Sequence, residues 1–119
     1  MNKVDLKTRT KSFALRVIAL VESLPKGRTA DVLGKQLLRC GTSVGANYRA
    51  ACRARSTADF IFKMGIVEEE VDEAIFWMEL LVEAGLLNTD DLKELMDEAD
   101  QLLAMTVASI KTARNKSQK

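Results

Sequence analysis

The side chains best suited to chemistry in this sequence are the carboxylates between Glu68 and Glu73. Di-iron centres in helix bundles bind metal through Glu from facing helices together with Glu-x-x-His pairs. The chain contains no His, so it offers neither those pairs nor the base of a Ser-His or Cys-His nucleophile. We therefore expect no catalytic residues, no metal and no cofactor. The acidic run is instead typical of a solvated or interfacial helix face.

A glycine-rich segment, Gly41 to Asn47, carries two glycines four residues apart. As a phosphate-binding loop the segment fails, because no Lys follows in the required arrangement and no strand is expected before it. On a helix, Gly41 and Gly45 would lie one turn apart and let another backbone approach closely. We favour close helix contact for this pair.

Asn47 is the unusual polar residue, since its spacing places it among Cys40, Val44 and Ala51 on the apolar side of a helix. A buried amide needs hydrogen-bond partners. Arg39, Glu70 and Glu73 are the candidates, and Asn47, Glu70 and Glu73 are expected to form a structural polar core. A lone Asn of this kind fixes helix register or subunit pairing; a ligand or catalytic role is the alternative.

The charges are unevenly distributed along the chain. Residues 1–63 hold 13 basic and 4 acidic side chains, whereas residues 64–119 hold 5 and 13. The basic half contains a stripe roughly opposite the expected core, formed by Lys35, Arg39, Arg49 and Arg53. Arg binds phosphate through forked hydrogen bonds, so such a row would follow a nucleic-acid backbone. The alternative is a solvated face whose charges pair between neighbouring helices or chains; the scarcity of aromatic residues favours it.

The strongest sign of a partner is the segment from Ala74 to Val82, which is apolar almost all round. A helix in an isolated bundle should show water a polar half. We therefore expect a homo-oligomer whose interface includes Phe76 and Trp77, together with Glu69 and Asp72 from the same outer face. The alternative is that Trp77 only borders the core.

These residues are placed by four segments with helical periodicity, at about 6–24, 29–54, 57–84 and 89–115. In each segment apolar residues recur at alternating spacings of four and three, which is the pattern of helices packed side by side. Connections at Pro25-Lys26-Gly27, Ser56 and Gly85 are short. Thr29, Ser56 and Asn88 or Thr89 are the expected helix caps. The prediction is one all-α domain, residues 1–119, folded as an antiparallel up-down-up-down four-helix bundle.

Composition agrees with this fold. A length of 119 residues suits one domain, and one Pro with six Gly leaves too few turns for a sheet protein. No apolar run reaches about 18 residues and no hydrophobic signal core begins the chain, so neither a membrane nor secretion is expected. Cys40 and Cys52 would lie about 18 Å apart on one helix, too far for a disulfide. We expect reduced thiols in a cytoplasmic protein.

Three stretches of the sequence together resemble a known family. They are Gln36 to Tyr48, Ala54 to Lys63 and Phe76 to Leu81. The combination of Arg-x-x-x-Ser, Gly-Ala-Asn, Ser-x-x-Asp-Phe and a late Trp is similar to that of the 23S ribosomal RNA intervening-sequence proteins, a bacterial four-helix bundle family. The match is clear from about residue 36 to 87, and the flanking helices fit in pattern only. Many members carry an acidic residue shortly after Gly-Ala-Asn, where this chain has Tyr48-Arg49-Ala50-Ala51.

The resemblance implies a small cytoplasmic protein that forms a ring, with a pentamer as the expected form. A similar fold occurs in the accessory protein of diversity-generating retroelements, whose basic surface binds nucleic acid. By that analogy the nucleic-acid-binding residues here would be Arg39, Arg49, Arg53 and Arg55, with Lys35 from the same stripe. The resulting hypothesis is a non-catalytic homo-oligomer that binds RNA or DNA through this surface. The alternative is a structural or protein-interaction scaffold that binds no nucleic acid.

Overall fold

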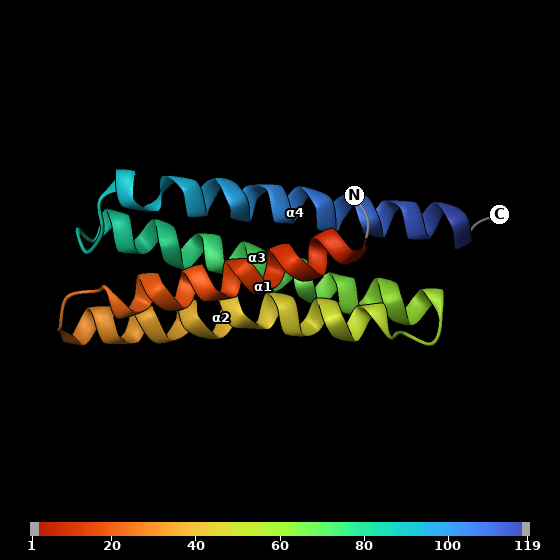
Figure 1. Cartoon of the computed structure of the whole chain (residues 1–119), viewed down its shortest axis with the longest axis horizontal. Coiled ribbons are helices and arrows are strands. Elements are labelled where there is room, and N and C mark those ends of the chain that lie inside the picture. Colours follow the sequence, from red (N-terminus) through yellow and green to blue (C-terminus); the bar gives the residue numbers. More distant parts are fainter. Residues whose placement is uncertain (1–2, 118–119) are drawn as a thin grey trace.

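A computed structural model describes residues 3–117 and shows four α-helices with no strand among those residues. The helices are α1 (Lys3–Glu22), α2 (Arg28–Cys52), α3 (Thr57–Glu83) and α4 (Thr89–Ser117). The all-α prediction is confirmed, and the expected boundaries hold within three residues. In Figure 1, each helix runs opposite to the one before it, and the four form a rod of 52 × 21 × 21 Å.

Local sequence explains where most helices begin and end. The Ser56 hydroxyl accepts a hydrogen bond from the backbone N–H of Asp59 at 3.0 Å, and the Asn88 side chain accepts one from Asp91 at 2.8 Å. Gly85 follows α3 with a φ of 78°, a conformation that favours glycine. The expected Thr29 cap is wrong: α2 begins one residue earlier, and its N-cap is Gly27, which makes no side-chain cap bond.

The core lies along the length of the rod. On α3 the predicted apolar positions are buried from Met64 to Leu81, while Phe60 is half-buried. On α4 the alternating spacing of four and three predicts Met96 and Leu103 as core positions. Leu95 and Leu102 are buried instead, and Met96 and Leu103 are only half-buried. Two threonines, Thr10 and Thr106, are also buried; each hydroxyl donates to the carbonyl four residues earlier at 2.7 Å. Their polar groups are thus satisfied within their own helices.

The two glycines of α2 let α1 approach closely. A Cβ atom added at Gly41 would lie 2.8 Å from both Cγ atoms of Val17, and one added at Gly45 would lie 3.3 Å from the Thr10 hydroxyl oxygen. Only glycine leaves room for this contact at Gly41. The predicted close helix contact is therefore confirmed.

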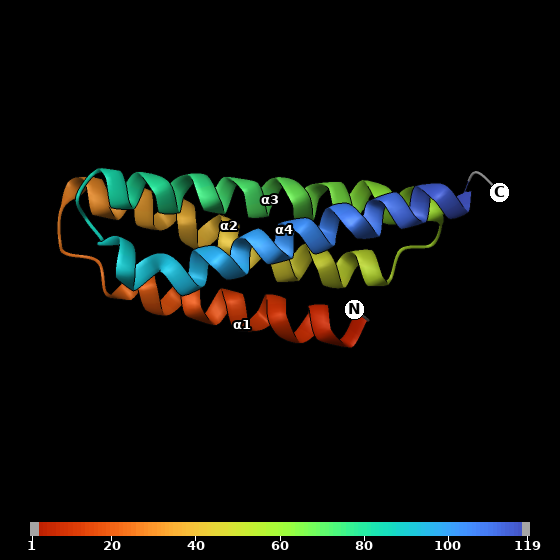
Figure 2. The ribbon, with the colours of Figure 1, turned by 90° about the horizontal axis from the view of Figure 1, so that it is seen from above.

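The first helix is the shortest, with 20 residues against 29 in α4. At 1.5 Å per residue this is a difference of about 13 Å. Figures 1 and 2 both show α2 and α4 extending beyond the start of α1 at the same end of the rod. Arg9 joins α1 to α4 through a two-pronged ion pair with Glu98, at 2.9 and 2.5 Å. At that end of the rod, the described part of α1 lies beside only part of α2 and α4.

Candidate nucleic-acid interface and self-association face

The predicted basic stripe lies on the solvent side of α2 and in the loop after it. Burial of Leu37, Cys40 and Val44 turns the opposite side of α2 outward. The five predicted nucleic-acid-binding side chains are all exposed: Lys35, Arg39, Arg49, Arg53 and Arg55. They are therefore accessible to a ligand, but their electrostatic partners differ.

Arg39 differs from the other four cations because its guanidinium already pairs with carboxylates of α3. Its Nη1 lies 3.4 Å from Glu70, and its Nη2 forms an ion pair with Glu73. Glu73 also accepts hydrogen bonds from the Cys40 thiol and, at 3.4 Å, from the Trp77 indole nitrogen. These donors hold the pKa of Glu73 below its usual value, with the Cys40 hydrogen bond as the largest cause. Arg39 thus ties α2 to α3, and its charge is largely balanced.

The expected polar core forms only in part. Glu70 and Glu73 come together on Arg39, but Asn47 is not among their partners. Its side-chain nitrogen donates to the carbonyl of Ser43 on its own helix at 2.8 Å. Asn47 is half-buried, and the next residue, Tyr48, takes the core position with 3% of its surface exposed.

The thiol of Cys40 is fully buried beside Glu73. Burial, followed by the hydrogen bond to the Glu73 carboxylate, raises the pKa of Cys40 to about 12. A thiol in this state is protonated at neutral pH and is a poor nucleophile. Both cysteines are free, as the sequence predicts.

The predicted self-association face lies on the outer side of α3. Phe76 leaves half of its surface exposed, and its ring packs edge-on against Trp77 with ring centroids 5.1 Å apart. Trp77 is half-buried against the core, while Glu69 and Asp72 are exposed nearby on the same helix. The sequence reasoning missed a second apolar surface, because Leu15 and Ile18 of α1 are also exposed. Their spacing of three residues on one helix face was the available signal.

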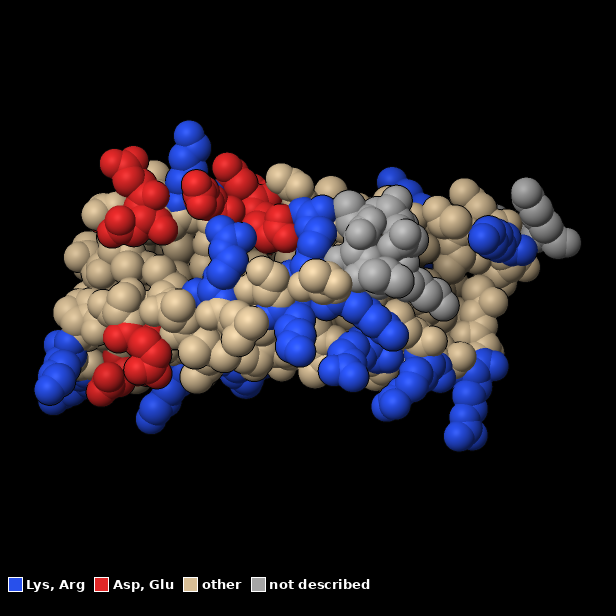
Figure 3. Space-filling view, in the orientation of Figure 1, with Lys and Arg blue, Asp and Glu red and all other residues tan. Residues whose placement is uncertain are grey.

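The topology separates the charges along the rod. The segments 6–17, 41–70 and 98–117 lie toward one end and contain 11 basic and 6 acidic residues; the segments 18–40 and 71–97 contain 5 and 10. In Figure 3 the acidic side chains visible on this face lie in the half nearest the 23–27 and 84–88 loops, whereas basic side chains lie in both halves and are the only charged ones visible in the other. The basic end includes cations that the sequence reasoning did not select: Lys7, Lys11, Lys111, Arg114 and Lys116.

Comparison with known proteins agrees with this architecture. Residues 2–108 match the family described as 23S rRNA-intervening sequence protein. The chain belongs to this family. A crystal structure of a protein of unknown function from the S23 ribosomal protein family of Bacteroides thetaiotaomicron superposes with a TM-score of 0.87 and 32% sequence identity. The alignment covers 93% of this chain and 99% of that one. No curated protein matches the chain.

Two negative observations bear on this 23S rRNA-intervening sequence protein. Within residues 3–117, no group of three or more His, Cys, Asp or Glu side chains is placed to hold a metal ion. Over the same described part of the chain, none of the helices has the length and apolar character needed to cross a membrane.

Proposed function

We propose that this protein is a non-catalytic homo-oligomer that binds nucleic acid, RNA or DNA, through the basic end of its bundle. The observation that carries the proposal is the separation of charge, because one end gathers 11 cations against 6 anions although the whole chain has a net charge of only +1. Nucleic-acid affinity comes largely from cations that displace counterions from phosphates, and a local basic surface suffices for that.

The cations at this end are available for phosphate. Arg49, Arg53 and Arg55 are exposed, and so are Lys111 and Lys116 from the last turns of α4. They come from two helices and a loop that the antiparallel arrangement brings to the same end (Figure 1). Such a surface contacts successive phosphates from more than one direction, which a single helical stripe does not.

A charge-reversal pair tests this proposal. Arg49→Glu with Arg53→Glu changes the charge of the basic end by four, and Lys26→Glu with Arg28→Glu makes the same change at the opposite end. In a gel-shift titration of single-stranded RNA at 50 mM salt, we expect the first pair to lose binding and the second to keep it. The native affinity should fall steeply with salt, with a slope of about 0.7 per phosphate contact. Equal losses in both pairs would refute a localised binding surface.

Self-association rests on the exposed aromatic surface of α3. Phe76 is half-exposed and lies near the acidic Glu69 and Asp72. An apolar surface bordered by basic side chains on a second copy would complement them. Such a contact is heterologous and closes into a ring when the rotation allows, five copies being the expected number. Light scattering should give a multiple of 13.2 kDa for the native chain and a monomer for Phe76→Glu, with Ala104→Glu as an exposed control. A native mass of 13.2 kDa would reject self-association.

The second candidate is a scaffold that assembles without nucleic acid. It is favoured by one observation, that Arg39 from the predicted stripe is already paired with Glu70 and Glu73. If the native protein forms its oligomer but shifts no RNA at 50 mM salt, the scaffold function replaces the first proposal.

A further inference from the structure

The basic end of the bundle contains a cavity of about 840 Å³. Leu6 is the one α1 residue among the described residues that line it. The remaining walls come from the end of α2, the start of α3 and the last turns of α4. Ligand sites in proteins commonly measure about 300–1,000 Å³ and are lined mainly by apolar groups with a few polar ones. The cavity has the size of a small-molecule site.

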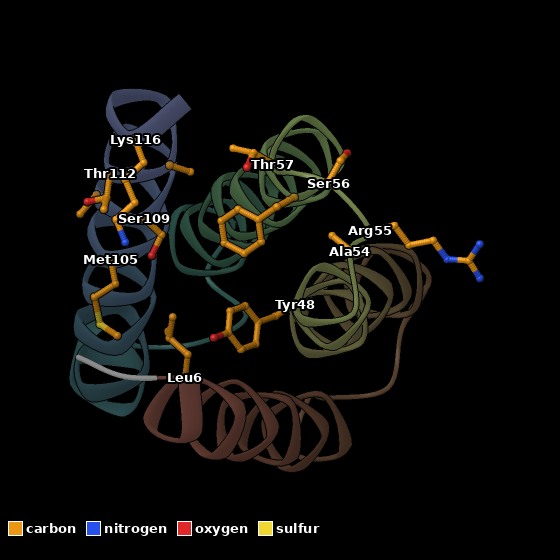
Figure 4. A pocket seen from close by; sticks show the side chains of 13 residues that line it. Leu6, Tyr48, Ala54, Arg55, Ser56, Thr57, Met105, Ser109, Thr112 and Lys116 are labelled. Atoms are coloured by element: carbon orange, nitrogen blue, oxygen red, sulfur yellow. The ribbon is translucent and has the colours of Figure 1, made fainter. Parts of the chain in front are cut away.

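The lining combines aromatic and aliphatic surface with hydroxyl groups. Tyr48, Phe60 and Met105 provide the larger apolar surfaces, and hydroxyls come from Ser56, Thr57, Ser109 and Thr112. Figure 4 shows Tyr48 and Ser109 facing this cavity, which is open to solvent; Tyr48 exposes only 3% of its surface. The Ser56 hydroxyl already caps α3. A flat, polar-edged ring can hydrogen-bond the hydroxyls of Ser109 and Thr112, which an acyl chain cannot do.

The charged groups around the cavity are of one sign. Arg55 and Lys116 are among its thirteen described lining residues, and none of the thirteen is acidic. Figure 4 shows Arg55 extending away from the cavity, so Lys116 is the lining cation left to meet an anionic group of a ligand. The ligand that fits is therefore a ring attached to an anion.

We infer that this end cavity binds one unpaired nucleotide of a bound RNA single strand, with the base against Phe60 and Met105 and a phosphate near Lys116. Proteins that bind single strands combine a cationic path for the backbone with aromatic surfaces for the bases. A duplex hides its bases, whereas an unpaired base can turn out of the strand and enter a pocket. The inference rests on the proposed function and adds a preference for single strands.

A cavity-filling variant separates the two proposals. Ala108 lines the cavity and Ala104 does not, and both are exposed on α4 one turn apart. Fluorescence polarisation with an eight-nucleotide adenylate RNA and an eight-base-pair RNA duplex would measure both affinities at 50 mM salt. Ala108→Phe should weaken single-strand binding at least tenfold and leave duplex binding unchanged, and Ala104→Phe should change neither. Equal single-strand affinities for the two variants would overturn the cavity inference while the basic surface stands. If the native chain bound neither RNA, the proposed function itself would be refuted.

The methionine methyl groups report the position of the ligand without any substitution. Met105 lines the cavity, whereas Met64 and Met78 are fully buried in the core. In protein labelled with ¹³C at the methionine methyls, the adenylate RNA should shift the Met105 signal and leave the other two in place. A shift with decanoate but not with the RNA would overturn the inference in favour of an acyl ligand. Unchanged Met105 with bound RNA would place the strand elsewhere.

Discussion

Replacing Gly41 by Ala measures how closely α1 and α2 approach. The new Cβ atom would lie 2.8 Å from both Cγ atoms of Val17 and 3.0 Å from its Cβ. Val17 is fully buried, and a β-branched residue in a helix has one strongly preferred rotamer, so it cannot turn away. Overpacking of this kind costs about 1–3 kcal/mol, and the higher helix propensity of Ala offsets about 1 kcal/mol. We expect Gly41→Ala to lower the free energy of unfolding by about 0–2 kcal/mol.

Gly65 in α3 is the matched control, because nothing lies within 4 Å of a Cβ atom added there. Gly65→Ala should raise the free energy of unfolding by about 0.5–1 kcal/mol from helix propensity alone. Urea unfolding followed by circular dichroism, at one protein concentration, gives both values. Combining Gly41→Ala with Val17→Ala should restore at least about 1 kcal/mol relative to the sum of the single changes. If Gly41→Ala stabilised the protein as much as Gly65→Ala does, the close contact would be refuted.

Three further changes test other contacts. Arg9→Ala should lower the free energy of unfolding by about 1–3 kcal/mol, because the half-buried Glu98 loses its charged hydrogen bonds between α4 and α1. Urea unfolding midpoints measure this loss, and an unchanged midpoint would contradict the prediction. A maleimide at pH 8 should label Cys52 at least tenfold faster than the buried Cys40, whose pKa is raised to about 12; peptide mass spectrometry compares the rates, and equal rates would count against a sealed core. Glu73 has a folded-state pKa below its usual 4.5, so its ionised form contributes stability above that pH that is lost as pH falls further. Glu73→Gln should therefore reduce the drop in melting temperature between pH 6 and pH 3, and an identical drop would show that the carboxylate contributes nothing.

The positions of the four helices could be predicted from the sequence, because each helix is long and its apolar residues recur at regular spacings. The prediction was least reliable on α2, where the spacing after Val44 can continue by three residues to Asn47 or by four to Tyr48. Gly41 and Gly45 resolve the choice, since α1 packs onto them and widens the buried side of α2. The large ring of Tyr48 then enters the core and the amide of Asn47 bonds to its own helix. A choice of this kind depends on the approach of a second helix, which periodicity within one segment does not contain.

The charged surfaces, like the core position on α2, could be predicted only in part from the sequence. Two oppositely charged halves of the sequence are visible by counting, but a count does not say where they meet. Hairpin connections bring the start of α1, the end of α2 and the end of α4 together, which adds the α4 cations to the basic end (Figure 1). The end cavity was equally out of reach, because its walls come from helices that are distant in sequence.

The two proposed surfaces are far enough apart to act independently. Phe76 lies 19 residues after the start of α3 at Thr57, which is about 29 Å along a helix axis. Interactions between exposed charges are largely screened beyond about 10 Å at 0.1 M salt. The self-association face around Phe76 therefore has little direct electrostatic influence on phosphate contacts at the basic end. Assembly would act on nucleic-acid binding through another route, by holding several basic ends at fixed spacing, so that one strand can engage more than one of them. A loss of oligomerisation should then reduce the affinity for long RNA more than the affinity for a strand that spans a single subunit.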